Sequence, residues 1–153
     1  MFGVDILDTT VDGAKRKELI QRIKTLGLPS HDHPLPLVTL EEFFTGNDDY
    51  GSIGCNLCSP PGPQFFFDNL KQIQSKANVQ DVLVEVTEVE ENDPAIRPFS
   101  DRVYVLAAAS PDDVAKWAVA LQPDAIEEGF TNGKPALAPE LRPGFRCYSL
   151  WWD

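Results

Sequence analysis

The feature that most constrains the fold of this chain is a change in the spacing of its apolar residues near position 80. In "PQFFFDNLKQIQSKA" apolar residues recur every three or four positions, which is typical of a helix with one buried face. Directly afterwards "DVLVEVTEV" alternates with a period of two, so three of its valines point one way while Leu83, Glu85 and Thr87 point the other. This pattern predicts a half-buried strand near 81–89 that follows a helix.

Three more segments have the composition of strands, near 52–57, 102–109 and 145–151. Ser110 followed by Pro111 predicts the start of a second helix between the last two strands, and "PDAIEEGF" predicts a further helical turn. The order of strand, helix, strand, strand, helix, strand is the split βαβ pattern called ferredoxin-like. We therefore expect an α+β fold with a four-stranded antiparallel sheet that carries two helices on one face.

The N-terminal part of the chain is predicted to be helical. Apolar spacing predicts a helix over residues 14–26, and Thr39 with Glu42 forms a capping box in front of a short helix, "LEEFF". With 153 residues the chain is long enough for one domain with a sizeable core. We expect a single domain over the whole chain, in which a helical part, 1–46, packs on an α+β core, 47–153.

The last strand raises the question of what covers the sheet. Its alternation puts Trp151 on the same side as Cys147, and Trp152 on the same side as Tyr148 and Leu150. Both faces thus carry large apolar side chains, and exposed apolar patches usually mark an interface. Either the N-terminal helices or a second subunit is expected to cover the second face, so a monomer and a homodimer are both open.

Two of the three cysteines, Cys55 and Cys58, have the C-x-x-C spacing of zinc sites and redox dithiols, and His31 with His33 completes a set of four candidate zinc ligands. However, "SPP" follows the second cysteine where a zinc knuckle turns through glycine. Prolines also separate the pair from the next helix, whose N-terminus would otherwise activate a thiol. We therefore expect no metal and no cofactor, and interpret the pair as one small core residue and one residue at a strand end.

A run of oxygen-bearing side chains, "GNDDYGS", lies between the predicted short helix and the first predicted strand. It resembles a calcium loop, but the twelfth position counted from Asn47, where an EF-hand has a bidentate glutamate, is Cys58. The alternatives are a polar turn or a ligand pocket that includes a residue at the start of a later strand. The residues of this candidate pocket are Asn47, Asp48, Asp49, Tyr50, Ser52, Asn56 and Asp101.

The chain carries 24 acidic and 13 basic residues, which gives a formal net charge of -11. Such a charge repels nucleic acid and attracts basic proteins, so we do not expect an RNA-binding sheet surface. Acidic residues are concentrated in 81–93, which contains no basic residue. We predict a contact surface for a basic protein partner there, and the alternative is a solvated face without a partner. The candidate partner-binding residues are Glu88, Glu90, Glu91 and Asp93.

Sequence motifs for catalysis are missing. The chain has no G-x-S-x-G, G-x-G-x-x-G or P-loop pattern, and its two histidines lie in one proline-rich loop. We assign no catalytic residue and favour a protein without enzymatic activity. No membrane contact is expected, because no apolar run is long enough to span a bilayer. Three cysteines cannot pair completely, so the cytoplasm is the expected compartment.

Three segments, "EEFFTGNDDYGSIGCNL", "RPFSDRVYV" and "LWWD", resemble parts of a set of small uncharacterised bacterial proteins. The resemblance covers roughly residues 36–153, and its most specific pattern is GN-x-D-x-GSIG-x-N. It implies a bacterial, cytosolic protein and brings no activity, cofactor or catalytic residue. By class alone, small acidic bacterial proteins without catalytic motifs are similar to immunity proteins that neutralise toxins.

Together these observations predict a non-catalytic binding or inhibitor-like module, of the immunity type, with an acidic surface. The alternative is a small enzyme or ligand-binding protein that uses a polar pocket around residues 47–56. Binding to a basic protein should depend on the acidic side chains and on salt, whereas binding of a small ligand should raise the midpoint of thermal unfolding.

Overall fold

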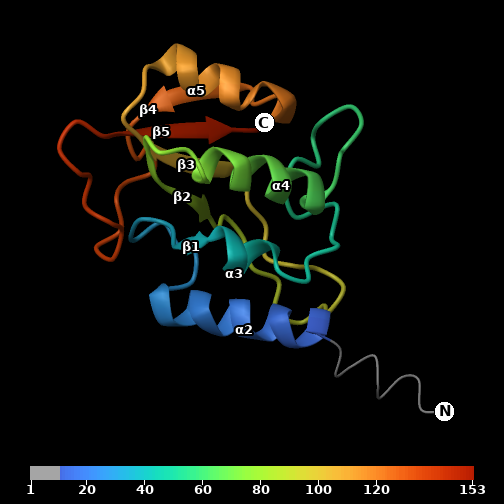
Figure 1. Ribbon diagram of the computed structural model, residues 1–153. Coiled ribbons are helices and arrows are strands. Elements are labelled where there is room, and N and C mark those ends of the chain that lie inside the picture. Colours follow the sequence, from blue (N-terminus) through green and yellow to red (C-terminus); the bar gives the residue numbers. More distant parts are fainter. Residues whose placement is uncertain (1–10) are drawn as a thin grey trace.

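The sheet of this protein has five strands, and all neighbouring strands are antiparallel. The computed structural model describes residues 11–153 (Figure 1). Across the sheet the strands follow the order β1-β2-β3-β5-β4. Their bounds are Leu37–Thr39 for β1, Val79–Glu85 for β2, Arg102–Ala107 for β3, Ala125–Glu128 for β4 and Arg146–Trp151 for β5. The predicted α+β class is confirmed.

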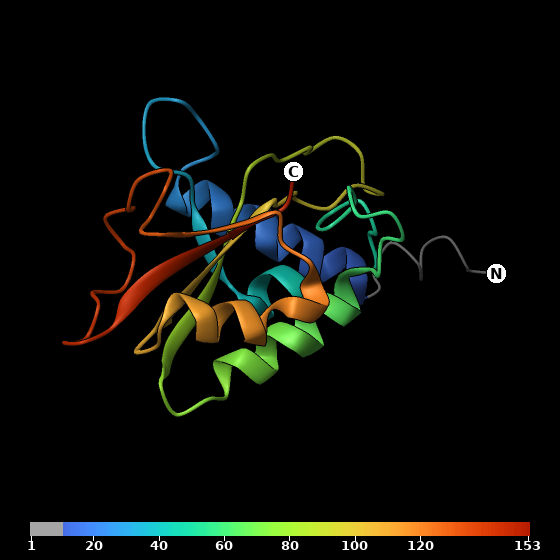
Figure 2. The ribbon, with the colours of Figure 1, turned by 90° about the horizontal axis from the view of Figure 1, so that it is seen from above.

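Helices cover one face of this sheet, and Figure 2 shows α4 and α5 side by side on it. The bounds are Val11–Leu26 for α2, Leu40–Phe44 for α3, Pro63–Gln74 for α4, Pro111–Trp117 for α5 and Val119–Leu121 for the 3₁₀ helix η1. Buried residues of all five elements share one core cluster with alternate residues of β2, β3 and β5. Among the helices of residues 11–153, none has both the length and the apolar character needed to cross a bilayer.

Two predicted helix starts are confirmed. The Thr39 hydroxyl accepts a hydrogen bond from the N–H of Glu42 at 3.0 Å, and the Glu42 carboxylate accepts one from the N–H of Thr39 at 2.9 Å. The Ser110 hydroxyl accepts the N–H of Asp113 at 3.2 Å, and Pro111 occupies the first turn. Both side chains satisfy backbone donors that have no partner within the helix itself.

The two faces of the sheet carry separate cores. Leu150 and Trp152 belong to the large core under the helices, where the Trp152 ring lies 5.2 Å from that of Phe66 on α4. The smaller cluster on the opposite face consists of Leu83, Tyr104, Leu106 and Cys147. Phe130, from the segment after β4, packs on this second cluster. The N-terminal helices α2 and α3 thus contribute to the core that contains Trp152, and the chain after β4 packs on the opposite face.

Residues 52–57 form turns, and the strand predicted there is wrong. The N–H of Ser52 donates to the carbonyl of Asp49 at 3.0 Å, and that of Leu57 donates to Gly54 at 3.2 Å. Gly54 has φ +68°, and a Cβ at this position would lie 2.4 Å from the Phe66 ring. Because glycine has no Cβ and tolerates a positive φ, the turn can approach α4 closely, and the backbone here is not that of a strand. The strand order behind the ferredoxin-like prediction is not observed.

The segment "PDAIEEGF" contains strand β4, so the helical turn predicted there is also wrong. Ala125 lies opposite Trp151, and Glu128 lies opposite Tyr148. Pairing with a neighbouring strand outweighs the helical preference of this short segment. The part before residue 46 likewise contributes β1 to the sheet, and not helices alone.

The cysteines divide in a way that differs from the prediction. Cys55 and Cys58 are both exposed, so their interpretation as a core residue and a strand-end residue is wrong. Cys147, on β5, is buried. Burial raises the pKa of the Cys147 thiol to about 12, so this thiol is not a reactive thiolate at neutral pH.

Candidate functional site

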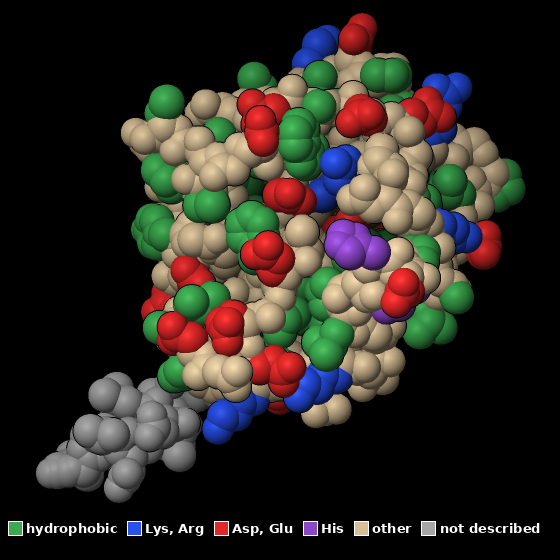
Figure 3. Space-filling model, turned by 180° about the vertical axis from the view of Figure 1, so that it is seen from behind, with side chains coloured by type: hydrophobic (Ala, Val, Ile, Leu, Met, Phe, Trp, Pro, Cys, Tyr) green, Lys and Arg blue, Asp and Glu red, His purple; other side chains and the backbone are tan. Residues whose placement is uncertain are grey.

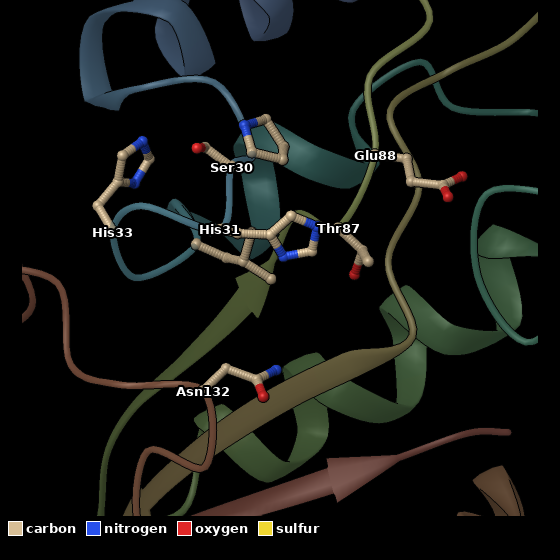
Figure 4. Close-up of a pocket in the computed structure, with 8 residues that line it drawn as sticks. Ser30, His31, His33, Thr87, Glu88 and Asn132 are labelled. Carbon is tan, nitrogen blue, oxygen red and sulfur yellow. The ribbon is translucent and has the colours of Figure 1, made fainter.

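A polar cleft lies where the chain leaves β2. The loop after α2 forms one wall and the segment after β4 forms the other, with a volume of about 550 Å³ between them. The lining residues are Pro29, Ser30, His31, His33, Leu35, Thr87, Glu88 and Asn132. Figure 4 shows the His31 ring directed toward Thr87, whereas the Glu88 side chain extends away from His31.

A buried carboxyl group lies behind this cleft, at the end of β2. Glu85 is 1% exposed, and its two oxygens accept hydrogen bonds from the Tyr104 hydroxyl and, at 2.8 Å, from the Asn132 side-chain amide. Burial raises the pKa of Glu85, and the two hydrogen bonds oppose part of this shift. Because both oxygens are occupied, the geometry favours a structural role, in which Glu85 holds the segment around Asn132 on the sheet.

Arg102 extends this polar cluster across the second face of the sheet. Its guanidinium donates to the Ser149 hydroxyl, which also accepts a hydrogen bond from Thr131 at 3.3 Å. The guanidinium lies over the Trp151 ring, 5.9 Å from its centroid. Attraction to Arg102 lowers the pKa of Glu85 slightly against the larger effect of burial. The segment after β4 is therefore fixed to the sheet by polar contacts as well as by Phe130.

The residues of the predicted pocket around 47–56 divide into a bonded group and exposed residues. The Asn47 amide donates to the Ser52 hydroxyl at 3.0 Å, and the Asp49 carboxylate accepts the backbone N–H of Arg97 at 2.9 Å. Asp48, Tyr50 and Asn56 are exposed. Asp101 belongs to a different contact, because it accepts the Thr87 hydroxyl at 3.2 Å. The bonded group forms the polar turn that was the alternative interpretation, and this turn holds the chain near Arg97.

Arg97 connects the same turn to the end of α3. It is 4% exposed, and its guanidinium donates to the carbonyl oxygens of Phe43, Thr45 and Gly46 at 3.2 Å each. These carbonyls lie at the C-terminal end of α3, where helical hydrogen bonds are missing. The positive charge of Arg97 therefore faces the interior and the helix end, and not the solvent.

All four predicted partner-binding residues are exposed and lie in one loop, residues 88–97, which we call the acidic loop. Arg16 on α2 fixes it by donating to the carbonyl oxygens of Glu90 at 2.7 Å, Asp93 at 2.9 Å and Ile96 at 2.9 Å. Glu91 forms an ion pair with Lys24 at 2.6 Å. Figure 3 shows Asp and Glu side chains gathered on the part of the molecule that carries this loop. The structure thus brings the predicted acidic residues together on a fixed backbone.

A hollow of about 470 Å³ lies beside the acidic loop, and we call it the acidic hollow. Its lining consists of Leu28, Pro29, Thr87, Glu88, Val89, Glu90, Glu91, Ile96, Arg97 and Phe99. Two of its apolar side chains are accessible, since Leu28 is 40% and Ile96 is 42% exposed. An apolar surface with carboxylates at its margin is suited to a side chain that has both an aliphatic part and a positive charge.

The four candidate zinc ligands lie in two separate segments. His31 and His33 line the polar cleft, whereas Cys55 and Cys58 lie in the turn before α4. Within residues 11–153, no three side chains of the metal-binding types come close enough to hold an ion.

Sequence reasoning missed the residues that organise these surfaces. Glu85 had a visible signal, because it is a carboxylate inside the apolar alternation of β2. Arg16 and Arg97 had none, since their partners are backbone carbonyls up to 80 residues away. Asn132 also had none, because it lies in a segment without periodicity.

Replacing Glu85 with glutamine is expected to remove one contribution to the pH dependence of stability. A raised pKa means that Glu85 binds its proton more tightly in the folded state than in the unfolded state. The protonated side chain therefore contributes its full stabilisation below the unfolded pKa of about 4.3, and this stabilisation is lost as the pH rises through the folded pKa. Glu85→Gln should therefore gain stability relative to the wild type as the pH rises above about 4.3, the pKa of an unfolded glutamate. Urea unfolding at several pH values measures this difference.

Glu127→Gln is the control for this experiment, since Glu127 is exposed on β4. It should show no such gain. A stability difference between Glu85→Gln and the wild type that is the same at every pH would contradict the role given to burial.

Comparisons with known proteins were consistent with one another. The model of a family described as "Uncharacterized protein YfbO family" matches residues 14–150. The chain is 37% identical over 123 residues to "Uncharacterized protein YfbO" of Escherichia coli (strain K12), covering 80% of this chain and 86% of the relative. No solved structure matches the chain.

Proposed function

Because the chain belongs to the YfbO family, whose description assigns no activity, we propose a function from its geometry: a non-catalytic module that binds a basic segment of a protein partner. The acidic loop and the acidic hollow form the proposed binding surface. An inhibitor-like role of the immunity type is one form that such binding takes.

The observation that supports this proposal most strongly is the way in which the acidic loop is fixed. Arg16 donates to backbone carbonyls of the loop, and within residues 11–153 the carboxylates of Glu88, Glu90 and Asp93 form no ion pair. A loop that is already ordered loses less conformational entropy when a partner binds. Uncompensated charges on such a loop also steer an oppositely charged partner during association.

The acidic hollow determines which basic segment fits. Its apolar surface includes Leu28 and Ile96, while Glu88 and Glu90 belong to the same lining. A partner segment that presents lysine or arginine beside an aliphatic residue would meet both features. A purely polar basic segment would leave the apolar part of the hollow in contact with water.

A designed peptide tests this proposal. The peptide has nine residues, in which glycine separates lysine from leucine. It is titrated into ¹⁵N-labelled protein. We expect amide signals of residues 88–97 to shift and the affinity to fall several-fold between about 50 and about 300 mM salt, because exposed charges are screened. The triple variant Glu88→Gln, Glu90→Gln, Asp93→Asn should weaken binding roughly tenfold, since exposed charge pairs contribute up to about 1 kcal/mol each.

The neutral variants are chosen because they preserve the shape of the loop. Glu90 and Asp93 accept the N–H groups of Asn92 and Ala95 at 2.9 and 3.0 Å, and an amide oxygen can do the same. A control with the same loss of charge elsewhere is Glu127→Gln, Glu128→Gln, Glu140→Gln, which should bind the peptide normally. Equal binding of a peptide with glutamate in place of lysine, or shifts outside the acidic loop and hollow, would contradict the proposal.

A further inference from the structure

We propose that a second, separate groove of this protein binds a small molecule that combines an apolar body with a protonated amine. This groove lies between the end of α2, the edge strand β1 and the arm formed by residues 134–142, and its volume is about 410 Å³. Its lining is Arg22, Leu26, Pro34, Pro36, Leu37, Thr39, Glu42, Asp81, Leu83, Pro135, Ala136, Leu137, Ala138 and Pro139. It shares no residue with the acidic hollow, so the inference goes beyond the proposed function.

The size and composition of the groove fit a small ligand. Binding sites for small molecules usually have volumes of about 300 to 1,000 Å³ and combine mainly apolar walls with a few polar groups. Ten of the lining residues are apolar or proline, and Leu137 on the arm is 77% exposed. A large apolar side chain at that exposure loses free energy in water, which a ligand's apolar body would recover.

The arm that forms one wall is held in place by dedicated contacts. The Gln80 side chain donates to the carbonyl of Glu140 at 2.8 Å and accepts the N–H of Arg142 at 2.9 Å. Lys134 forms an ion pair with Glu140 at 2.9 Å, and the N–H of Ala138 donates to Pro135 at 3.0 Å. Two prolines of the lining, Pro135 and Pro139, further restrict the backbone of the arm. The groove is therefore largely formed before any ligand binds, which favours affinity.

Asp81 gives the groove its preference for a positive charge. One of its carboxylate oxygens accepts the N–H of Val82 at 2.8 Å and the Gln74 amide at 3.5 Å. Within residues 11–153 the other oxygen accepts no hydrogen bond and remains available. The other charged lining residues, Arg22 and Glu42, neutralise each other in an ion pair of 3.0 Å. Burial also raises the pKa of Asp81, so a cationic ligand would relieve an unfavourable charge.

Three probes that differ in one group test the inference at about pH 7: phenethylamine, phenethyl alcohol and 3-phenylpropionate. All three carry the same ring, and only the amine carries a positive charge and N–H donors. Titration into ¹⁵N-labelled protein should give saturable amide shifts for Lys134, Ala136, Leu137, Ala138 and Asp81. We expect the amine to bind about tenfold more tightly than the alcohol, and the carboxylate most weakly, since one charge-assisted hydrogen bond accounts for a factor of that size.

Asp81→Asn separates the preference for a positive charge from the binding of the apolar body. Its amide oxygen can still accept the N–H of Val82, so the fold is preserved while the charge is lost. In this variant the amine and the alcohol should bind equally, whereas Asp68→Asn, an exposed carboxylate on α4, should leave the preference unchanged. Leu137→Ala should weaken all three probes to a similar extent.

The possible failures are distinguishable. A preference for the amine that persists in Asp81→Asn would overturn the role of Asp81, and no saturable shift with any probe would overturn the site. The acidic-loop triple variant should bind phenethylamine normally. Failure of the peptide experiment therefore leaves this inference intact, and failure of the probe experiment leaves the proposed binding of a basic segment intact.

Discussion

Replacing Arg97 with methionine is expected to destabilise the protein by roughly 3 to 5 kcal/mol, because several hydrogen bonds from a buried charged group are lost at once. The guanidinium supplies donors to three carbonyl oxygens at the end of α3, and methionine supplies none. Methionine keeps a similar side-chain length, so the loss reflects the hydrogen bonds more than a cavity. Chemical denaturation measures the change in the free energy of unfolding.

Arg22→Met is the matched control for this prediction. Arg22 forms an ion pair with Glu42 at 3.0 Å, but its side chain is 47% exposed, so its loss should cost less than about 1 kcal/mol. If the two variants have the same stability, Arg97 does not anchor α3. A second measurement follows from the connection to the acidic loop: Arg97→Met should speed amide hydrogen exchange in residues 88–97 more than Arg22→Met does.

Replacing Trp152 with alanine is also expected to lower the free energy of unfolding, by roughly 3 to 5 kcal/mol. Trp152 is 1% exposed, its ring meets Phe66 edge-on, and its indole N–H donates to the carbonyl of Leu121 at 2.7 Å. Alanine would leave a cavity between α4 and η1 and a carbonyl without its donor. Thermal and urea unfolding, followed by circular dichroism, measure the loss.

The neighbouring tryptophan provides a control of the same size. Trp151 lies on the other face of β5, is only partly buried and contacts the Arg102 guanidinium. Trp151→Ala should cost about 1 to 2 kcal/mol. The opposite ranking of the two variants would show that the assignment of the two tryptophans to the two faces is wrong.

What the sequence predicts well in this protein is local. The alternation in β2 assigns Val82 and Glu85 to opposite faces as observed, and Thr39 and Ser110 mark helix starts through side-chain bonds to residues three positions away. These features depend on spacing along the chain, so a single sequence contains them.

What the sequence does not predict depends on partners far along the chain. β4 exists because β5 pairs with it, although its own residues have a helical pattern. The turn at 52–57 has apolar residues like a strand, but Gly54 brings it close to Phe66 instead. For the surfaces, the acidic residues were visible, whereas Arg16, which fixes their loop, donates to backbone carbonyls and so leaves no pattern of charged pairs.

The anchoring of the acidic loop through carbonyl oxygens has a consequence for how relatives of this protein can diverge. Every residue type has a carbonyl, so substitutions along the loop leave the contacts of Arg16 with the Glu90, Asp93 and Ile96 positions chemically intact. Loops on a rigid scaffold are where binding residues vary most between homologues. Mutation can therefore exchange the side chains of this loop, and with them the choice of partner, while selection on stability acts on Arg16, which anchors the loop from α2.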